Sequence, residues 1–469
     1  MVRTDSPSRA LLRFGRLRRV AAACLLLCLG AMAVAGARAV TDVKPPRLTY
    51  GVSTLPNGLT LILHEDHSTP IVNVQVWYHV GSKNERPARR GLAHLFEHLM
   101  FKGSRNVQPE QHTALIAGAG GLSNAYTTED VTVFWETVPS PYLPLALWLE
   151  ADRMATLRIE RQEFEREREI VREERRMRVE NQPYGRLSEI VNGHAFTIHP
   201  YKYPTIGSMA DLDAVPTLDE VRAFYRTFYV PSNATVVIAG DIDAAVAADL
   251  VAKYFGRIPR PGHTVPRDLP AEPPLKSPRR LAVEEDWPLP VVVVAHHVTA
   301  DGHPDSYPLL VAAKILSDGQ SSRIYRALVY ETGLALSAAG VGDLGEHPKL
   351  FYAYAVVQPG HTANDAEQAL ARELDRLRSE PVSEQELARA KNQFTRDFVM
   401  GRQTVQQKAS ILGRASVLRG GDVASADAEL DRFHRVTAAD IQRVAQAYFA
   451  PSSRMVITVS PRLAKGDRP

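Results

Sequence analysis

The chain has 469 residues, of which 45% are hydrophobic and 23% are charged, and its formal net charge is only +3. This composition is that of a globular protein, because a disordered chain is poorer in hydrophobic residues and carries a larger net charge. Basic and acidic residues are mixed along the sequence, so no nucleic-acid groove is expected. At roughly 100–200 residues per domain, the length predicts two to four domains.

The N-terminus has the pattern of a secretory signal peptide. Several arginines precede an apolar run that begins at Val20, and the motif Ala-Arg-Ala ends at Ala39. We expect removal of residues 1–39, which leaves no stable membrane span and places the mature chain in the periplasm or outside the cell. If the run is not cleaved, it serves as a single membrane anchor. Both cysteines, Cys24 and Cys28, lie in the run, so the mature protein is expected to contain no thiol.

Hydrophobic periodicity downstream of this segment predicts a mixture of strands and helices. Residues that favour β-structure cluster between Leu59 and Val80 as two strands joined near residues 66–70. The next expected elements, in chain order, are a helix over 89–102, a strand over 128–138, an amphipathic helix over 141–157 and a long charged helix over about 160–181.

A proline-rich segment separates two similar stretches of sequence. Residues 258–280 contain prolines at a density that no helix or central strand tolerates, which indicates an interdomain linker. Residues 217–232 resemble residues 437–452 at an offset of 220 residues, and each predicts a capped helix, a Pro-Ser turn and a β-rich run. We therefore expect an internally duplicated α+β architecture with two homologous halves, over 47–257 and 281–461, and a cleft between them.

The chemistry suggested by the sequence begins in the segment His94-Leu95-Phe96-Glu97-His98. A hydrolytic zinc site needs three protein ligands and one open position for water. His94 and His98 are four residues apart, so on a helix they lie on one face and reach the same ion. Glu97 lies between them, where a carboxylate can act as general base toward a metal-bound water. This H-x-x-E-H order is the inversion of the commoner H-E-x-x-H order.

A third ligand is expected from another helix. The charged segment over 163–178 offers glutamates at positions 163, 165, 167, 169, 173 and 174. Most of them are expected to form ordinary ion pairs along a solvated helix. Charge alone does not select the ligand among them.

These motifs resemble those of the pitrilysin or insulinase-like metallopeptidases, a family that includes the mitochondrial processing peptidases and bacterial periplasmic proteins. Residues 91–104 are similar to the zinc helix of that family, and Asn124-Ala125-Tyr126-Thr127 resembles its Asn-Ala-x-Thr segment. The resemblance extends over residues 50–460. It implies a processing-peptidase-like fold of two halves and a peptide-bond hydrolase with one Zn²⁺ per chain. Such sites also accept Mn²⁺ or Co²⁺.

The resemblance also implies the roles of individual carboxylates. The third ligand in the family ends a Glu-Arg-x-x-x-x-x-Glu pattern, which matches residues 167–174 and selects Glu174, with Glu173 as the fallback if the register slips by one. Glu167, two helical turns earlier on nearly the same face, would orient the ligands or assist proton transfer. Zn²⁺ would polarise the scissile carbonyl while Glu97 passes a proton from water to the leaving amine.

Asn124 and Ala125 are implied to bind the peptide substrate, because the family holds its substrate there as an added strand. Asn124 is equally suited to a turn. The second half has no zinc site of its own, since its counterpart helix over 307–316 contains neither histidine nor glutamate. One metal ion per chain is therefore expected.

The second half also departs from the family at two substrate-contacting positions. The family's arginine and tyrosine align with Val329 and Leu336. Arg323, Arg326 and Tyr330 lie nearby, but the helix register argues against a simple replacement. We therefore expect a homologous partner chain that lacks the zinc ligands and supplies the arginine and the tyrosine.

The sequence thus predicts a zinc endopeptidase that acts on unfolded or short peptides as one half of a clam-shell pair. Two alternatives stay open. One is a non-catalytic peptide-binding or assembly subunit of a processing-peptidase-like complex, which the missing arginine and tyrosine favour and the intact ligand set opposes. The other is a dedicated maturation protease for one peptide, whose chemistry is the same as that of general degradation.

Overall fold

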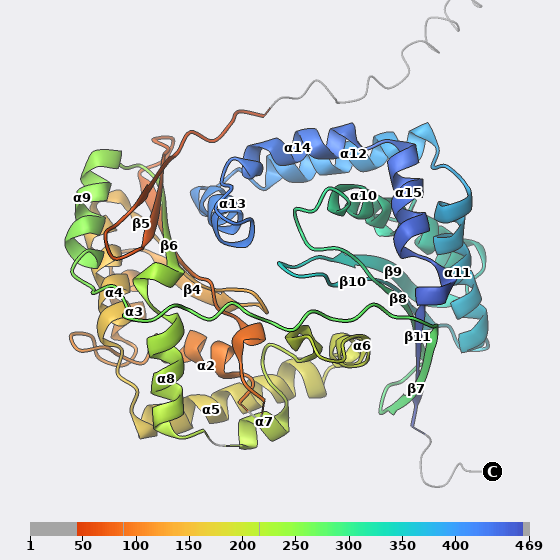
Figure 1. The fold of residues 1–469 in the computed structure, drawn as a ribbon, viewed down its shortest axis with the longest axis horizontal. Coiled ribbons are helices and arrows are strands. Elements are labelled where there is room, and N and C mark those ends of the chain that lie inside the picture. Colours follow the sequence, from red (N-terminus) through yellow and green to blue (C-terminus); the bar gives the residue numbers. More distant parts are fainter. Residues whose placement is uncertain (1–44, 88, 215, 463–469) are drawn as a thin grey trace, which may run out of the picture. The chain divides into compact units, whose positions relative to one another are not determined.

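The computed structural model of the chain describes residues 45–87, 89–214 and 216–462. Contacts group residues 46–469 into one compact unit, which holds two β-sheets covered by helices (Figure 1). The predicted α+β architecture is confirmed. The expected signal peptide, residues 1–39, lies outside the described residues. Within the described part, no helix is both long and apolar enough to cross a membrane.

The first sheet has the strand order β1-β2-β6-β3-β5-β4, in which only β2 and β6 run parallel. Its strands are β1 (Gly51–Thr54), β2 (Thr60–Glu65), β3 (Ile71–Tyr78), β4 (Leu122–Thr127), β5 (Thr132–Pro139) and β6 (Ala234–Gly240). The helices of the same stretch of chain are α2 (Leu92–Leu99), α3 (Gln111–Gly118), α4 (Leu143–Thr156), α5 (Arg161–Arg175), α6 (Leu187–Ala195), α7 (Met209–Asp213), α8 (Leu218–Phe228) and α9 (Ala244–Phe255).

The second sheet has the order β7-β11-β8-β10-β9, in which only β7 and β11 run parallel. Its strands are β7 (Arg279–Glu285), β8 (Val291–His297), β9 (Ala335–Asp343), β10 (Leu350–Val357) and β11 (Met455–Pro461). Its stretch of chain also forms α10 (Ser306–Ser317), α11 (Ala363–Ser379), α12 (Glu384–Met400), α13 (Val405–Leu418), α14 (Ser425–Arg435) and α15 (Ala438–Tyr448).

The two sheets repeat one pattern of strand pairing. In each, the strand after a Pro-Ser turn lies between a parallel and an antiparallel neighbour: β6 between β2 and β3, and β11 between β7 and β8. Capping boxes at Thr217 and Thr437 begin the preceding helices, α8 and α15. The similarity of residues 217–232 to residues 437–452 therefore marks a repeated structural unit.

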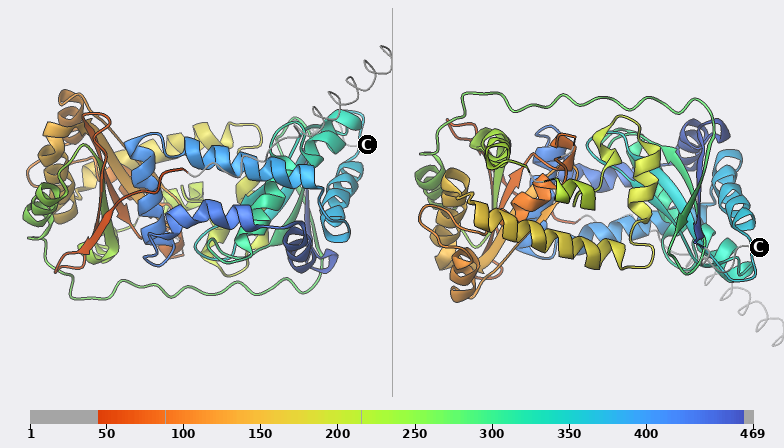
Figure 2. Two further views of the ribbon diagram at one scale, coloured as in Figure 1. Left: turned by 90° about the horizontal axis from the view of Figure 1, so that it is seen from above. Right: turned by 90° about the horizontal axis from the view of Figure 1, so that it is seen from below.

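Residues 259–278 contain neither helix nor strand, as their proline content predicts. They form a long connection between α9 and β7 that can be followed in Figures 1 and 2. Every strand of the first sheet precedes this connection and every strand of the second sheet follows it. The limits of the halves and the linker, 47–257, 281–461 and 258–280, stay predictions, because contacts place both sheets in one unit.

Each sheet is covered on one face by a helix from the other half of the chain. The helix α13 packs against β3 and β6, and its Leu412 joins Trp77 in a buried cluster. The helix α6 packs against β8 through Ile190 and Val191. A Cβ atom on Gly413 would lie 2.3 Å from Nε1 of Trp77, so α13 approaches the sheet at a distance that only glycine permits. The halves are therefore interlocked as well as joined by the linker.

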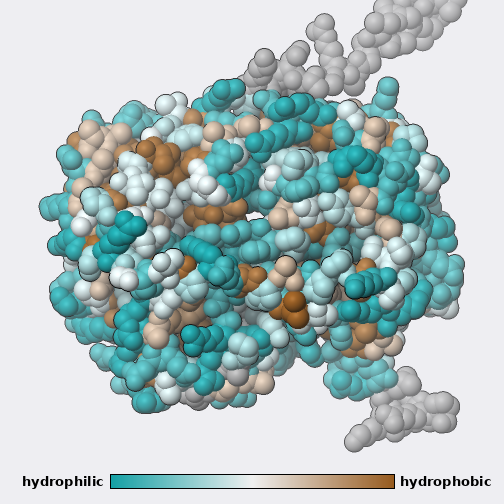
Figure 3. All heavy atoms as spheres, in the orientation of Figure 1, coloured by the Kyte–Doolittle hydropathy of each residue, from teal (hydrophilic) through white to brown (hydrophobic). Residues whose placement is uncertain are grey.

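The surface contrasts with these buried layers. On the face shown in Figure 3, hydrophilic side chains predominate and hydrophobic side chains form only small groups. The apolar residues that organise the fold lie between the sheets and their covering helices.

Candidate metal centre

The helix that carries the H-x-x-E-H residues is short and firmly anchored. α2 begins after Gly91, whose φ of 83° is left-handed, and the carboxylate of Glu85 accepts hydrogen bonds from the backbone N–H groups of Gly91 and Ala93 at 2.9 and 2.7 Å. These bonds satisfy donors that a helix N-terminus leaves unpaired. The predicted helix over 89–102 is therefore too long at its start. It is also too long at its end. The backbone hydrogen bonds that begin at His98 join residues three apart, as in a turn, and do not continue the α-helix.

Burial fixes the orientation of α2. Its buried residues pack into the core beside α5, β4 and β5: Leu92, Ala93, Leu95, Phe96 and Leu99. His94, Glu97 and His98 belong to the remaining face. The pattern of apolar residues thus turns the three predicted functional side chains toward α5 and the edge of the sheet.

The structure brings His94, His98 and Glu174 together, with potential ligand atoms all within 4.8 Å of one another. Oε2 of Glu174 lies 3.7 Å from Nε2 of His94 and 3.4 Å from Nε2 of His98. These distances exceed those of ordinary hydrogen bonds, roughly 2.7–3.2 Å. They resemble the roughly 3.4 Å between ligand atoms that each lie about 2.0–2.1 Å from a tetrahedral ion.

The surroundings of these atoms also fit a metal ion. Oε2 of Glu174 is buried and makes no hydrogen bond within the described ranges. Burial lowers the pKa of His94 to about 4. Burial acts in the same direction on His98, but the carboxylates of Glu167 and Glu174 outweigh it and raise the pKa of His98 to about 9. The two carboxylates therefore favour positive charge at His98, whereas burial keeps His94 neutral, the form in which a histidine binds zinc.

The structure distinguishes Glu174 from the fallback ligand. The side chain of Glu173 is 57% exposed and pairs with Arg176 at 2.9 Å. The side chain of Glu174 is only 16% exposed and faces both histidines. Of the two, Glu174 alone lies where a third ligand is needed.

Glu167 lies behind His98, on the side away from Glu174. Its Oε2 is 3.4 Å from Nδ1 of His98, and its Oε1 is 3.2 Å from Nζ of Lys102. This places Glu167 at the ring nitrogen that does not face Glu174, as an orienting partner would lie. Lys102 was not predicted, although it lies within the stretch that resembles the zinc helix.

Glu97 contacts the edge strand β4. The hydroxyl of Thr127 donates a hydrogen bond of 2.7 Å to Oε2 of Glu97. Burial raises the pKa of the Glu97 carboxyl, against the effect of this bond. Thr127 belongs to the Asn-Ala-x-Thr motif but was assigned no role. Strand alternation could have found it, because Ala125 and Thr127 lie on the same face of β4.

The predicted strand over 128–138 is present as β5 (Thr132–Pro139), but it begins four residues later than expected, after a turn. The hydroxyl of Thr128 accepts hydrogen bonds from the backbone N–H groups of Asp130 and Val131, both at 3.1 Å, and so stabilises a turn between β4 and β5. Asn124 therefore lies in a strand and not in a turn. β4 ends its sheet among the described strands, so Asn124 and Ala125 lie on an edge to which an extended peptide can pair.

The group of potential metal ligands borders, through His94 and Glu174, a cleft of about 460 Å³ that both halves line. Its lining includes His94, Thr127, Glu174, Arg178 and Tyr203 from the first half and Asp343 and Lys349 from the second. Lys349 is 5% exposed and pairs with Asp343 at 2.8 Å and with Glu129 at 3.5 Å. The connection between β9 and β10 thus carries the second half to the cleft, a contribution that the sequence did not reveal.

The two positions at which the family has an arginine and a tyrosine do not line this cleft. Among the described residues that line the cleft, neither Val329 nor Leu336 is present. Arg323 instead pairs with Glu386 at 2.7 Å, and Arg326 pairs with Glu331 at 2.6 Å. Neither of these two arginines lines the cleft, so neither replaces the family's substrate-contacting arginine.

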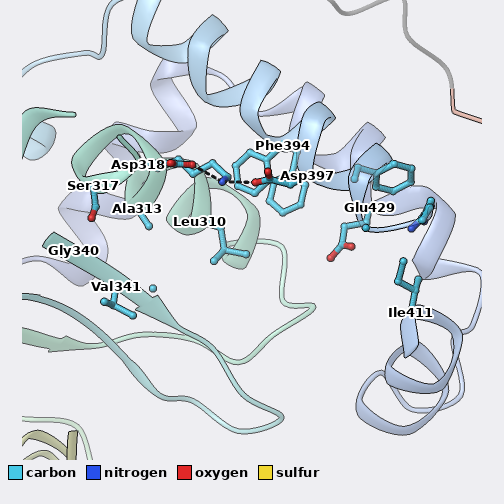
Figure 4. A pocket seen from close by; sticks show the side chains of 16 residues that line it. Leu310, Ala313, Ser317, Asp318, Gly340, Val341, Phe394, Asp397, Ile411 and Glu429 are labelled. Carbon is cyan, nitrogen blue, oxygen red and sulfur yellow. Dashed lines mark hydrogen bonds and ion pairs between the residues drawn. The ribbon is translucent and has the colours of Figure 1, made fainter. Parts of the chain in front are cut away.

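A cavity of larger volume, about 730 Å³, lies in the second half among α10, α12, α13, α14 and β9 (Figure 4). Lys314 donates hydrogen bonds to Asp318 and Asp397 at 2.8 and 2.7 Å, so its charge is neutralised within the cavity wall. None of the predicted site residues lines this cavity. Its size therefore does not mark the reactive centre.

A second histidine–glutamate group, the buried group, consists of His112, Glu136 and Glu150, whose potential ligand atoms also lie within 4.8 Å of one another. Nε2 of His112 lies 2.9 Å from Oε1 of Glu136. Nη2 of Arg153 donates to the same oxygen at 3.2 Å, and its Nε donates to Oε2 of Glu150 at 2.9 Å. The guanidinium supplies the positive charge that an ion would bring, so this group is an ion network and not a metal site.

Comparison with known proteins finds family matches in both halves of the chain. Residues 60–209 match the family Insulinase (Peptidase family M16), and residues 217–394 match the Peptidase M16 inactive domain. The chain is 28% identical over 411 residues to the zinc protease PqqE of Helicobacter pylori, covering 87% of this chain and 92% of that relative.

Solved structures show the same similarity. The crystal structure of a protease from Helicobacter pylori has a TM-score of 0.84 at 28% identity, covering 88% of this chain and 100% of that chain. Pitrilysin has a TM-score of 0.73 at 20% identity, covering 90% of this chain but 46% of the pitrilysin chain. The pitrilysin chain thus has more than twice the length of the matched region.

Proposed function

The chain belongs to the insulinase family of peptidases, peptidase family M16, and we propose that it is a zinc-dependent endopeptidase that hydrolyses unfolded or short peptides. The observation that carries this proposal is the convergence of His94, His98 and Glu174 on one point, with Glu97 on the same helix as the histidines. A similar protein of Helicobacter pylori is named a zinc protease, which supports the same chemistry.

Each residue of the cluster has a role in the proposed reaction. His94, His98 and Glu174 would hold Zn²⁺, whose Lewis acidity would act on the scissile carbonyl and on the attacking water. Glu97 takes a proton from that water and delivers it to the leaving amine. Thr127 holds Oε2 of Glu97 at 2.7 Å, so Oε1 remains for proton transfer.

The edge strand suits a substrate of variable sequence. Backbone pairing of an extended peptide with β4, beside Asn124 and Ala125, provides affinity through groups that every peptide has. Most of the backbone of a folded protein is already paired in its own helices and strands and is not free to extend along β4. The proposed substrates are therefore unfolded segments or short peptides.

We further propose that a homologous partner chain completes the cleft by supplying an arginine and a tyrosine. The second half of this chain has Val329 and Leu336 at the corresponding positions. This chain matches only 46% of the pitrilysin chain, so a second unit of similar length fits the remainder of that protein. Export through the predicted signal peptide would place the pair in the periplasm or outside the cell.

The alternative function is a non-catalytic peptide-binding or assembly subunit. The observation that favours it is the pair Asp343 and Lys349, which neutralise each other at 2.8 Å and so leave the second half without a free positive charge in its part of the cleft lining. The same edge strand and cleft would then bind peptides without cleaving them.

Peptide cleavage and zinc content of the purified chain test these proposals. For Glu97→Gln we expect unchanged zinc content and a loss of roughly 10²–10⁴-fold in kcat. Glu173→Gln, which alters an exposed carboxylate next to the site, is the matched control and should retain activity. Wild-type activity in Glu97→Gln would refute the catalytic assignment. Full activity from a verified monomer or homodimer would refute the need for a different partner.

A further inference from the structure

The two carboxylate oxygens of Glu174 have different environments. Oε2 faces Nε2 of His94 and of His98 and makes no hydrogen bond within the described residues. Oε1 lies 2.5 Å from Nη1 of Arg178. One oxygen is therefore directed to the histidines while the other is already occupied by a guanidinium.

The position of Arg178 follows from a change in helix type. α5 ends at Arg175, and Arg176–Glu180 forms a π-helix, a rare conformation that is frequent at functional sites. The buried Arg175 anchors this turn, because its Nη1 donates to Oε1 of Glu189 at 2.6 Å and to the carbonyl oxygen of Gly207 at 2.7 Å. The backbone that carries Arg178 is thus fixed to α6 and to the loop that follows it.

Other ion pairs along the same helix lie in solvent, away from the cleft. Arg176 pairs with Glu173 at 2.9 Å, and Arg161 pairs with Glu165 at 3.3 Å, but both carboxylates are about half exposed. Pairs of this kind contribute little, because water screens them. Glu174 differs because it is mostly buried, and Arg178 differs because it lines the cleft together with His94 and Thr127.

We propose that Arg178 is a positioning residue of the metal centre: by holding Oε1 of Glu174, it leaves Oε2 as the single oxygen that binds the ion. The inference rests on the proposed function, because it assumes that His94, His98 and Glu174 hold zinc. Two histidines and one carboxylate oxygen fill three positions and leave the fourth open, as a hydrolytic site requires. A carboxylate that bound through both oxygens would crowd that position and, with water bound, raise the coordination number from four to five.

Zinc affinity, measured by competition with a chromophoric chelator, tests this inference. Arg178→Ala should bind zinc roughly 10–100-fold more weakly than wild type, the usual effect of removing a partner of a metal ligand. Arg178→Lys should recover part of the affinity, because it keeps the charge but lacks the planar donors of arginine. Arg176→Ala is the matched control, since it removes the same charge from the same π-helix without touching Glu174, and should bind as wild type does.

The possible results separate this inference from the proposed function. Equal zinc affinity for wild type and Arg178→Ala would overturn the inference alone. The same loss in Arg176→Ala would also overturn it, because the loss would then not depend on contact with Glu174. A wild-type chain that binds no zinc would overturn both. Arg178 is 76% exposed, so its replacement should leave thermal unfolding unchanged.

The visible spectrum of the Co²⁺-loaded protein gives a second readout. Four-coordinate Co²⁺ absorbs more strongly than five-coordinate Co²⁺, so geometry can be followed directly. We expect a weaker band in Arg178→Ala than in wild type, because Glu174 can then bind through both oxygens. An unchanged band would overturn the claim that Arg178 selects one oxygen.

Discussion

Two groups of the same residue types behave as opposites. The cleft group, His94, His98 and Glu174, and the buried group both keep their potential ligand atoms within 4.8 Å. In the buried group, His112 and Arg153 lie at hydrogen-bond distance from the carboxylates, and a guanidinium supplies the positive charge. In the cleft group, the distances are 3.4 and 3.7 Å. One group contains its own cation and the other is arranged to bind one.

Removing the built-in cation should have the largest effect on stability. Arg153 is fully buried between Glu136 and Glu150, so Arg153→Met leaves two carboxyl groups without their partner. We expect the free energy of unfolding to fall by about 3–5 kcal/mol while the folded protein keeps its zinc. Denaturant unfolding with metal analysis measures both. Loss of zinc together with wild-type stability in Arg153→Met would mean that the buried group, and not the cleft group, binds the metal ion.

The buried group should also make stability depend on pH. Burial raises the pKa of Glu150 to about 8, against the charge of Arg153. The unfolded chain releases this proton above about pH 4.3, whereas the folded chain holds it. The stabilisation from Glu150 is therefore complete below about pH 4.3 and is lost as the pH rises to about 8.

Glu150→Gln isolates this contribution, because glutamine does not ionise. Over that pH range, the wild type should lose stability relative to the variant by at most about 1.4 kcal/mol per pH unit. Unfolding curves at several pH values provide the comparison. Parallel pH profiles for the two proteins would contradict the assignment of the buried proton to Glu150.

In the cleft group, loss of a ligand should affect metal binding rather than folding. Glu174→Gln is expected to weaken zinc binding by at least about 100-fold, more than the usual effect of losing an outer partner. Glu173→Gln changes the adjacent, exposed carboxylate and should bind zinc normally. Calorimetric or chelator titration distinguishes them. Equal affinities, or the reverse order, would mean that the third ligand is misassigned.

The smallest expected effect is at Thr127, which contacts the proposed base and not the ligands. Thr127→Val removes the hydroxyl that donates to Glu97, and kcat should fall roughly 10-fold with zinc content unchanged. Thr127→Ser retains the donor and should retain most of the activity. If both variants matched wild type, the hydrogen bond would have no part in positioning Glu97.

The fold elements that local patterns specify were predictable. The zinc helix, the charged helix and the repeated capped helices follow from spacing, caps and periodicity, and Glu174 followed from its resemblance to a family motif. The exchange of α6 and α13 between the halves was not predictable, because it depends on faces that meet only after folding. The hairpin before β5 was missed because Thr128 stabilises a turn within a run of β-forming residues.

The partners of the site were also hidden from sequence reasoning. Lys349 reaches the cleft from more than 150 residues beyond Glu174 in the chain. Arg178 looks like one more charged residue of a solvated helix until the π-helix and the burial of Glu174 are seen. Tertiary contacts, and not residue type, give these side chains their environment.

The central claim is that each chain binds one zinc ion, in the cleft group and not in the buried group. The most direct measurement is the number of zinc ions per folded chain in wild type, His98→Gln and His112→Gln. We predict one, none and one, respectively. Two ions in wild type, or zinc that survives His98→Gln but is lost in His112→Gln, would contradict this account.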